Sequence, residues 1–143
     1  MADERDESVI PIESDADVVT ARQRAREMAG ALELTTTDQT LLATAISEVA
    51  RNITTYAKRG EVLLSVVRDD NGRKGIQVVA RDEGPGIENL ELALRDGYTS
   101  GSGLGLGLPG ARRLVDDFDI ETTPGQGTKV TLVMWARPNS RAA

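Results

Sequence analysis

Two segments in the first half of the chain carry apolar residues at the spacing of an amphipathic helix. In residues 17–34 and 38–57 these residues recur three and four positions apart, which places them on one side of a helix. A short stretch that combines Ser or Thr with Asp stands at the start of each segment, at residues 14–17 and 35–38. These residue types cap helix N-termini. We therefore predict two helices, each with one buried stripe. The stripe of the second helix is formed by Leu42, Ala45, Ile46, Val49 and Ile53.

Later segments are short and rich in β-branched residues, or alternate between apolar and polar residues, and these patterns predict strands. Asn71-Gly72 lies between two of them and is a hairpin signal, because both residues tolerate positive φ. Strands are predicted at 9–12, 61–67, 75–82, 120–123 and 128–135, and shorter helices at 89–95 and 109–117.

This order of elements predicts an α+β fold in which a mostly antiparallel sheet carries its helices on one face. With 143 residues the chain has the size of one domain. We expect a single domain over residues 9–135, a flexible acidic arm over 1–8 and a frayed tail over 136–143.

The composition of the chain excludes several classes of functional site. The chain has no Cys and no His, which excludes thiolate or imidazole metal sites, a Ser-His-Asp triad and a phosphorylated histidine. Its net charge of -6 resides in the first 17 residues, and the rest is balanced, so we expect no nucleic-acid surface. It contains no apolar run long enough for a membrane span, and its N-terminus is acidic. The expectation is a cytoplasmic protein with no membrane partner.

Glu48 and Asn52 lie four residues apart on the second predicted helix. They are therefore separated by roughly 40° around the helix axis and flank the buried stripe, whereas Ser47 and Arg51 are expected to face solvent. The pair could border a cleft over the helix, or it could be an ordinary half-exposed polar pair.

The segment Asp82-Glu-Gly84-Pro-Gly86 directly follows a predicted strand. Its glycines would allow a ligand to approach the backbone while a carboxylate accepts hydrogen bonds. Asp, Gly and Pro are also turn formers, so a plain turn is the alternative interpretation.

Alternating glycines fill residues 101–107, just before the predicted helix at 109–117. Free backbone amides at a helix N-terminus suit phosphate groups, although a flexible loop would have the same composition. Gly105–Gly110 matches G-x-G-x-x-G, but no strand precedes it and no acid follows about 20 residues on, so it is not a dinucleotide fingerprint. Gly125-Gln-Gly127-Thr128 joins the last two predicted strands and by itself indicates a hairpin.

The order of these motifs, ExxxN, DxGxG, GxGxG and GxGT, resembles that of the GHKL ATPase superfamily, over roughly residues 9–135. The resemblance implies a two-layer α/β sandwich of the Bergerat type with a mixed, mostly antiparallel sheet. Residues 45–53, 96–98 and 103–114, together with Tyr56 and the ending Val133-Met-Trp135, look like those of the RsbT-like switch kinases, stand-alone Ser/Thr kinases of bacterial partner-switching modules.

The resemblance implies a role for each motif. Glu48 would be the general base that accepts the proton of a serine or threonine hydroxyl, and Asn52 would bind Mg²⁺. Asp82 would accept the adenine amino group of ATP, and Thr128 would close the adenine site. The remaining nucleotide contacts would come from Gly84, Gly86, Gly101, Ser102, Gly103, Leu104, Gly105, Leu106 and Gly107.

The resemblance also implies protein partners. The substrate would be a Ser or Thr of a STAS-domain antagonist in a stressosome-like complex, and the released kinase would activate a PP2C-type phosphatase. Two alternatives are an anti-sigma factor kinase of the RsbW or SpoIIAB type and a non-catalytic ATP-dependent interaction protein.

Overall fold

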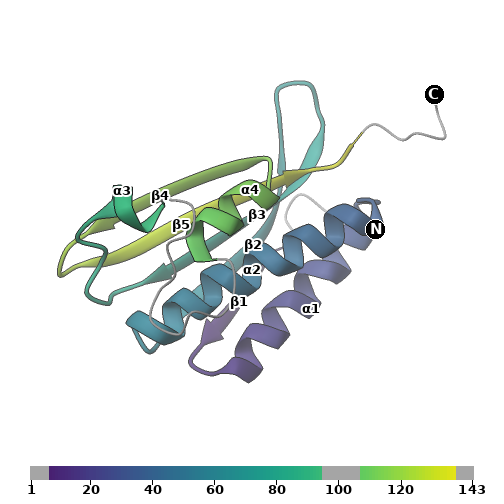
Figure 1. Ribbon diagram of the computed structural model, residues 1–143. Helices are drawn as coiled ribbons and strands as arrows, with labels where there is room; N and C mark the ends of the chain where they lie inside the picture. Colours follow the sequence, from purple (N-terminus) through teal and green to yellow (C-terminus); the bar gives the residue numbers. More distant parts are fainter. Residues whose placement is uncertain (1–6, 95–106, 138–143) are drawn as a thin grey trace.

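The computed structural model describes residues 7–94 and 107–137. Figure 1 shows α1, α2 and α4 on one face of a single sheet, which confirms the predicted α+β fold with two layers. In chain order the elements are β1 (Glu7–Ile12), α1 (Asp15–Ala31), α2 (Thr36–Tyr56), β2 (Gly60–Arg68), β3 (Lys74–Asp82), α3 (Leu90–Ala93), α4 (Gly107–Leu114), β4 (Asp117–Thr123) and β5 (Gly127–Trp135).

The sheet has five strands in the order β1-β2-β3-β5-β4, and each neighbouring pair is antiparallel. β3 pairs with β5, so strands from separate hairpins meet at the centre of the sheet. In this register Asp82 lies opposite Thr128. The pairing therefore places two of the predicted site residues side by side at one end of the sheet.

The core between the two layers is aliphatic, and α2 runs through its middle. Leu42, Ile46 and Ile53 are buried as predicted. Ser47, which was expected to face solvent, is also buried, and its hydroxyl donates to the Ala43 carbonyl at 3.0 Å. The helical projection was wrong here because α1, α4 and the sheet all pack against α2, whereas the projection assumed one buried side.

The boundary between α4 and β4 also differs from the sequence-based prediction. The helix predicted at 109–117 covers Gly107–Leu114, and the strand predicted at 120–123 begins at Asp117. Pairing with β5 explains the shift, because the Asp116 N–H donates to the Val133 carbonyl at 3.1 Å. Phe118 and Ile120 then pack against the core, while the acidic residues that alternate with them, Asp117, Asp119 and Glu121, are exposed.

The start of the domain extends further than predicted. β1 begins at Glu7, so the last two residues of the expected arm over 1–8 belong to the sheet, and residues 1–6 lie outside the described part. Ser8 pairs with Leu64, and its hydroxyl accepts a hydrogen bond from Arg24 Nε at 2.7 Å. These contacts hold the N-terminal end of β1 against β2 and α1.

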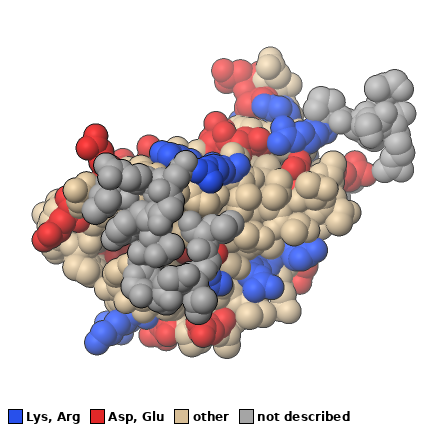
Figure 2. All heavy atoms as spheres, viewed as in Figure 1, with Lys and Arg blue, Asp and Glu red and all other residues tan. Residues whose placement is uncertain are grey.

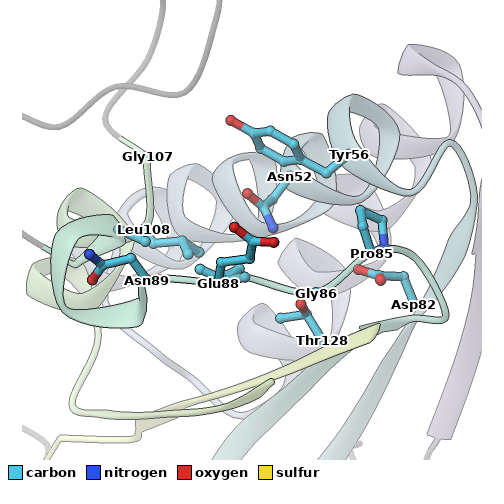
Figure 3. A pocket seen from close by; sticks show the side chains of 12 residues that line it. Asn52, Tyr56, Asp82, Pro85, Gly86, Glu88, Asn89, Gly107, Leu108 and Thr128 are labelled. Carbon is cyan, nitrogen blue, oxygen red and sulfur yellow. The ribbon is translucent and has the colours of Figure 1, made fainter. Parts of the chain in front are cut away.

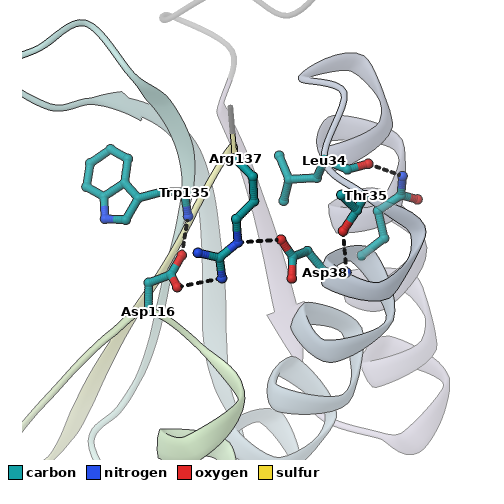
Figure 4. A network of polar contacts seen from close by, with 7 residues as sticks. Leu34, Thr35, Asp38, Asp116, Trp135 and Arg137 are labelled. Atoms are coloured by element: carbon teal, nitrogen blue, oxygen red, sulfur yellow. Dashed lines mark hydrogen bonds and ion pairs between the residues drawn. The ribbon is translucent and has the colours of Figure 1, made fainter. Parts of the chain in front are cut away.

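The first two residues of the expected frayed tail, Ala136 and Arg137, are also held. The Ala136 N–H donates to the Lys74 carbonyl at 2.8 Å. Arg137 lies between two carboxylates, 3.0 Å from Asp38 and 3.0 Å from Asp116 (Figure 4). One guanidinium thus joins the N-terminal turn of α2 to the segment between α4 and β4. The rest of the predicted tail, 138–143, lies outside the described residues.

Arg137→Ala should destabilise the fold measurably. The Asp38 side chain is only 8% exposed, and loss of its partner would leave a buried carboxylate oxygen without a hydrogen bond. We expect the free energy of unfolding to fall by about 1–3 kcal/mol, as measured by urea denaturation. Arg22→Ala, at an exposed position of α1, is the control and should have little effect. If Arg137→Ala costs as much in an Asp38→Asn background, the ion pair is not the cause.

Two observations on the described residues concern membrane spans and surface charge. Within residues 7–94 and 107–137, no helix combines the length and the apolar character needed to cross a bilayer. On the face shown in Figure 2, acidic and basic side chains of the described residues are interspersed. This distribution matches the balanced charge of the chain beyond its first 17 residues.

Candidate functional site

A cavity of about 340 Å³ lies at the end of the sheet where β3 stops and β5 starts. Its walls come from the last turns of α2, the segment that follows β3, and the start of α4 (Figure 3). The lining residues are Asn52, Tyr56, Asp82, Pro85, Gly86, Ile87, Glu88, Asn89, Ala93, Gly107, Leu108 and Thr128. The structure therefore brings five of the predicted site residues, from four separate motifs, to one cavity.

Asp82 is the last residue of β3, and its half-buried carboxylate lies at the cavity wall. The Gly84 N–H donates to its Oδ1 at 2.8 Å. Burial raises the pKa of Asp82, and hydrogen bonds from the backbone of Gly84 and Thr128 partly oppose this rise. Such a carboxylate has lone pairs left for a ligand, and a ligand that donates a hydrogen bond stabilises its charged form.

Thr128 forms part of the cavity wall next to Asp82 and is tied to the β4–β5 hairpin. Its hydroxyl lies 3.0 Å from the Thr122 hydroxyl, which also accepts a hydrogen bond from the Ile87 N–H at 2.9 Å. This small network fixes the segment after β3 against β4. It therefore holds one wall of the cavity in place without using a charge.

The two polar residues of the predicted pair on α2, Glu48 and Asn52, have different surroundings. Asn52 lines the cavity, and Tyr56, one turn further along α2, lines it beside Asn52. Glu48 does not line it. The Glu48 side chain is 9% exposed, its Oε1 accepts from the Gly107 N–H at 2.8 Å, and its Oε2 lies 3.2 Å from Arg51. Glu48 thus caps the N-terminus of α4, directly behind the cavity wall.

The predicted glycines behave differently from one another. Gly86 lines the cavity with φ +74°, and a Cβ there would lie 2.5 Å from the Thr123 carbonyl oxygen. Gly84 does not line the cavity. A Cβ at Gly84 would lie 2.5 Å from the Ala57 Cβ, so this glycine allows the loop to pack against the end of α2.

The phosphate-binding loop predicted by sequence is represented only by its last residue. Gly107 has φ +68° and lines the cavity at the start of α4. The other predicted loop residues, Gly101, Ser102, Gly103, Leu104, Gly105 and Leu106, lie outside the described residues, as do residues 96–98.

Several cavity residues were not predicted from the sequence. Tyr56 continues the four-residue spacing from Glu48 and Asn52, so helical periodicity could have identified it. Ile87 is an apolar residue directly after the DxGxG motif, which is a weaker signal. Glu88, Asn89 and Leu108 reach the cavity only through the tertiary packing of the segment after β3 and of α4.

The donor set suits a hard cation. The described residues contain no group of three or more His, Cys, Asp or Glu side chains that could hold a metal alone. Asn52 and Glu88 nevertheless offer oxygen atoms to the same cavity. Mg²⁺ typically takes one or two protein oxygens, with phosphates and waters as its other ligands, so the cavity fits a Mg²⁺ that arrives with a nucleotide.

Comparisons with known proteins agree with this geometry. Residues 12–134 match the model of the family described as histidine kinase-like ATPase domain. The serine/threonine-protein kinase RsbT of Bacillus subtilis is 42% identical over 132 residues, which are 92% of this chain and 98% of that protein. The anti-sigma F factor of Caldanaerobacter subterraneus is 28% identical over 67% of this chain and 69% of its own length.

A solved structure shares the fold. The crystal structure of the RsbU and RsbW domains of Rv1364c from Mycobacterium tuberculosis superposes with a TM-score of 0.63 at 19% sequence identity. The match covers 93% of this chain and 33% of that chain. The fold of this chain therefore corresponds to about one third of the longer Mycobacterium tuberculosis protein.

Proposed function

The chain belongs to the histidine kinase-like ATPase family, and we propose that it is the kinase of a bacterial partner-switching module, acting on a STAS-domain antagonist in the cytoplasm. The resemblance found in the motifs is confirmed by the identity to RsbT over nearly the full length of both chains. The protein is an ATP-dependent serine/threonine kinase. Its relatives also include anti-sigma factors, so protein partners are part of its function.

One observation carries the proposed site: Asn52, Asp82, Gly86, Gly107 and Thr128 meet at one cavity although they come from four motifs. In the proposal, Asp82 accepts the adenine amino group and Thr128 closes the adenine end of the cavity. Gly86 allows the base to approach the backbone. Gly84 has an indirect part, because it packs the loop against Ala57.

The phosphates would lie toward Gly107 and the preceding residues 101–106. Free N–H groups at the start of a helix favour phosphate oxygens. Asn52 would hold Mg²⁺, which when bound neutralises charge on the phosphates. Because the Glu48 carboxylate accepts a hydrogen bond from the Gly107 N–H, it lies next to this end of the cavity. In the proposal it accepts the proton of an incoming Ser or Thr hydroxyl, and the remaining contribution to transfer is positioning.

The relatives favour a switch kinase over an anti-sigma factor. Identity to RsbT is 42% over 98% of that protein, whereas the anti-sigma F factors of Caldanaerobacter subterraneus and Clostridium acetobutylicum match over 69% and 64% of their lengths at 28% and 32% identity. The partner proposed for the released kinase is a PP2C-type phosphatase. An anti-sigma factor kinase remains the alternative, and a non-catalytic ATP-dependent role is less favoured because both Glu48 and Asn52 are present.

The proposal is tested by incubating the protein with labelled ATP-Mg²⁺ and the STAS-domain proteins of the same genome, followed by phosphosite mapping. We expect one or more Ser or Thr sites to be labelled in a STAS protein. Capture experiments with the phosphatase and with sigma factors then separate the two switch types. Capture of a sigma factor without labelling of any STAS protein would contradict the proposal.

A further inference from the structure

Two oxygen-bearing side chains face each other across the cavity. Asn52 extends from α2, and Glu88 extends from the segment between β3 and α3. Figure 3 shows the Glu88 carboxylate beside the Asn52 side-chain amide, whose nitrogen lies on the side of Glu88. Glu88 belongs to none of the four motifs that define the predicted site.

The Glu88 carboxylate is exposed to the cavity and takes part in no hydrogen bond or ion pair with the described residues. None of the described residues that line the cavity is Lys or Arg. Among the residues that the structure describes, this acidic side chain therefore borders a ligand-sized cavity that has no lining cation to balance it.

A carboxylate in this position should oppose the binding of a triphosphate, because like charges repel. A divalent cation between the two anionic groups reverses the sign of this effect. Mg²⁺ accepts one or two protein oxygens in addition to phosphate oxygens and waters. Rotation of the Asn52 amide by about 180°, which exchanges its oxygen and nitrogen, would present the Asn52 oxygen to the same space as the Glu88 carboxylate.

We propose that Glu88 supplies a second protein oxygen, opposite Asn52, to the divalent cation that accompanies ATP. The inference rests on the proposed nucleotide site, and it adds a metal-binding residue that lies outside the four motifs. Glu88 touches neither the hydroxyl nor the transferred phosphoryl group in this proposal. Its effect passes through the cation.

Glu88→Gln tests the inference, because it keeps the shape and an oxygen atom of the side chain and removes its charge. Glu91→Gln is the matched control, since Glu91 lies on α3, is exposed and does not line the cavity. ATP affinity is measured by calorimetry for each variant with Mg²⁺ and with EDTA. Mn²⁺ binding in the presence of ADP is measured by electron paramagnetic resonance, which needs no catalytic turnover.

We expect Glu88→Gln to weaken Mn²⁺ binding in the ADP complex on the order of tenfold, and to weaken ATP binding in Mg²⁺. In EDTA the same variant should bind ATP at least as tightly as the wild type, because a repulsive charge has gone. The Glu91→Gln protein should match the wild type throughout.

Tighter or unchanged ATP binding by Glu88→Gln in Mg²⁺ would overturn the inference, since the carboxylate would then act only by repulsion. Equal weakening in Mg²⁺ and EDTA with a lower melting temperature would also overturn it and indicate a structural role. Failure of the wild type to bind ATP in Mg²⁺ would instead contradict the proposed function itself.

Discussion

Asp82→Asn is expected to abolish ATP binding, with a loss of affinity of at least about a hundredfold. The substitution replaces one acceptor oxygen by an NH₂ donor and removes the charge. In the proposed site this NH₂ can face the adenine amino group, so an attractive charged hydrogen bond of roughly 1.5–3 kcal/mol is lost and two donors are opposed. Every 1.4 kcal/mol corresponds to a tenfold change in affinity.

The environment of Asp82 makes this effect specific to the ligand. Burial raises the pKa of Asp82, so ionisation of the free site is disfavoured and a donor from the ligand compensates for that cost. The fold itself should tolerate asparagine, which can still accept the Gly84 N–H. We therefore expect a melting temperature close to that of the wild type, and no stabilisation when ATP-Mg²⁺ is added.

Calorimetric titration with ATP-Mg²⁺ measures the affinity. Asp119→Asn is the matched control, because Asp119 is exposed on β4, and it should bind ATP normally. GTP presents a carbonyl where ATP presents an amino group, so the wild type should discriminate against GTP. Retention of ATP affinity within threefold in Asp82→Asn would refute the assignment of Asp82 to the adenine base.

Glu48→Gln is expected to reduce phosphoryl transfer by about 10² to 10⁴, the usual contribution of a positioned general base. Glutamine keeps an oxygen that can accept the Gly107 N–H, so the cap of α4 and the ATP affinity should both be preserved. Rates are measured by transfer of labelled phosphate to the acceptor protein at saturating ATP. Glu27→Gln, at an exposed residue of α1, should transfer at the wild-type rate.

Glu48→Ala should differ from Glu48→Gln because it removes the cap as well as the base. We expect an additional loss of roughly 1 kcal/mol in the free energy of unfolding, typical of an N-cap truncation. Comparison of the two variants thus separates the structural contact from the chemistry. Transfer at the wild-type rate in Glu48→Gln would show that another group, or no group, accepts the proton.

The parts of the site that could be predicted from sequence depend on local geometry. Helical spacing singled out Asn52 and a turn at a strand end singled out Asp82, whereas the role of Thr128 came from the resemblance of the motif order to the GHKL ATPases. Each of these signals lies within one element or one turn. Asp82 and Thr128 meet because β3 pairs with β5, and the packing of α2 brings Asn52 to the same cavity. A pattern of this kind is visible without knowledge of the tertiary structure.

The parts that could not be predicted depend on contacts between distant segments. Glu88 reaches the cavity because the hydrogen bond from the Ile87 N–H ties the segment after β3 to Thr122. The end of α4 is set by pairing of the Asp116 N–H with Val133, and Arg137 is held by Asp38 at the start of α2. Neither periodicity nor turn preference carries information on such partners.

The single tryptophan of the chain has an optical consequence that follows from the position of β5. Trp135 pairs with Gly75 at one end of β3, whereas Asp82 at the other end borders the cavity. The two positions are seven residue steps apart along the strand, a span of about 23 Å. The indole Nε1–H donates to Asp117 at 2.7 Å, and the Arg73 guanidinium lies 5.4 Å from the ring centroid. Fluorescence of the Trp135 indole therefore reports on the end of the sheet where Arg137 is anchored. Ligand binding in the cavity would have to be followed by the fluorescence of Tyr56, or of a dye attached near it.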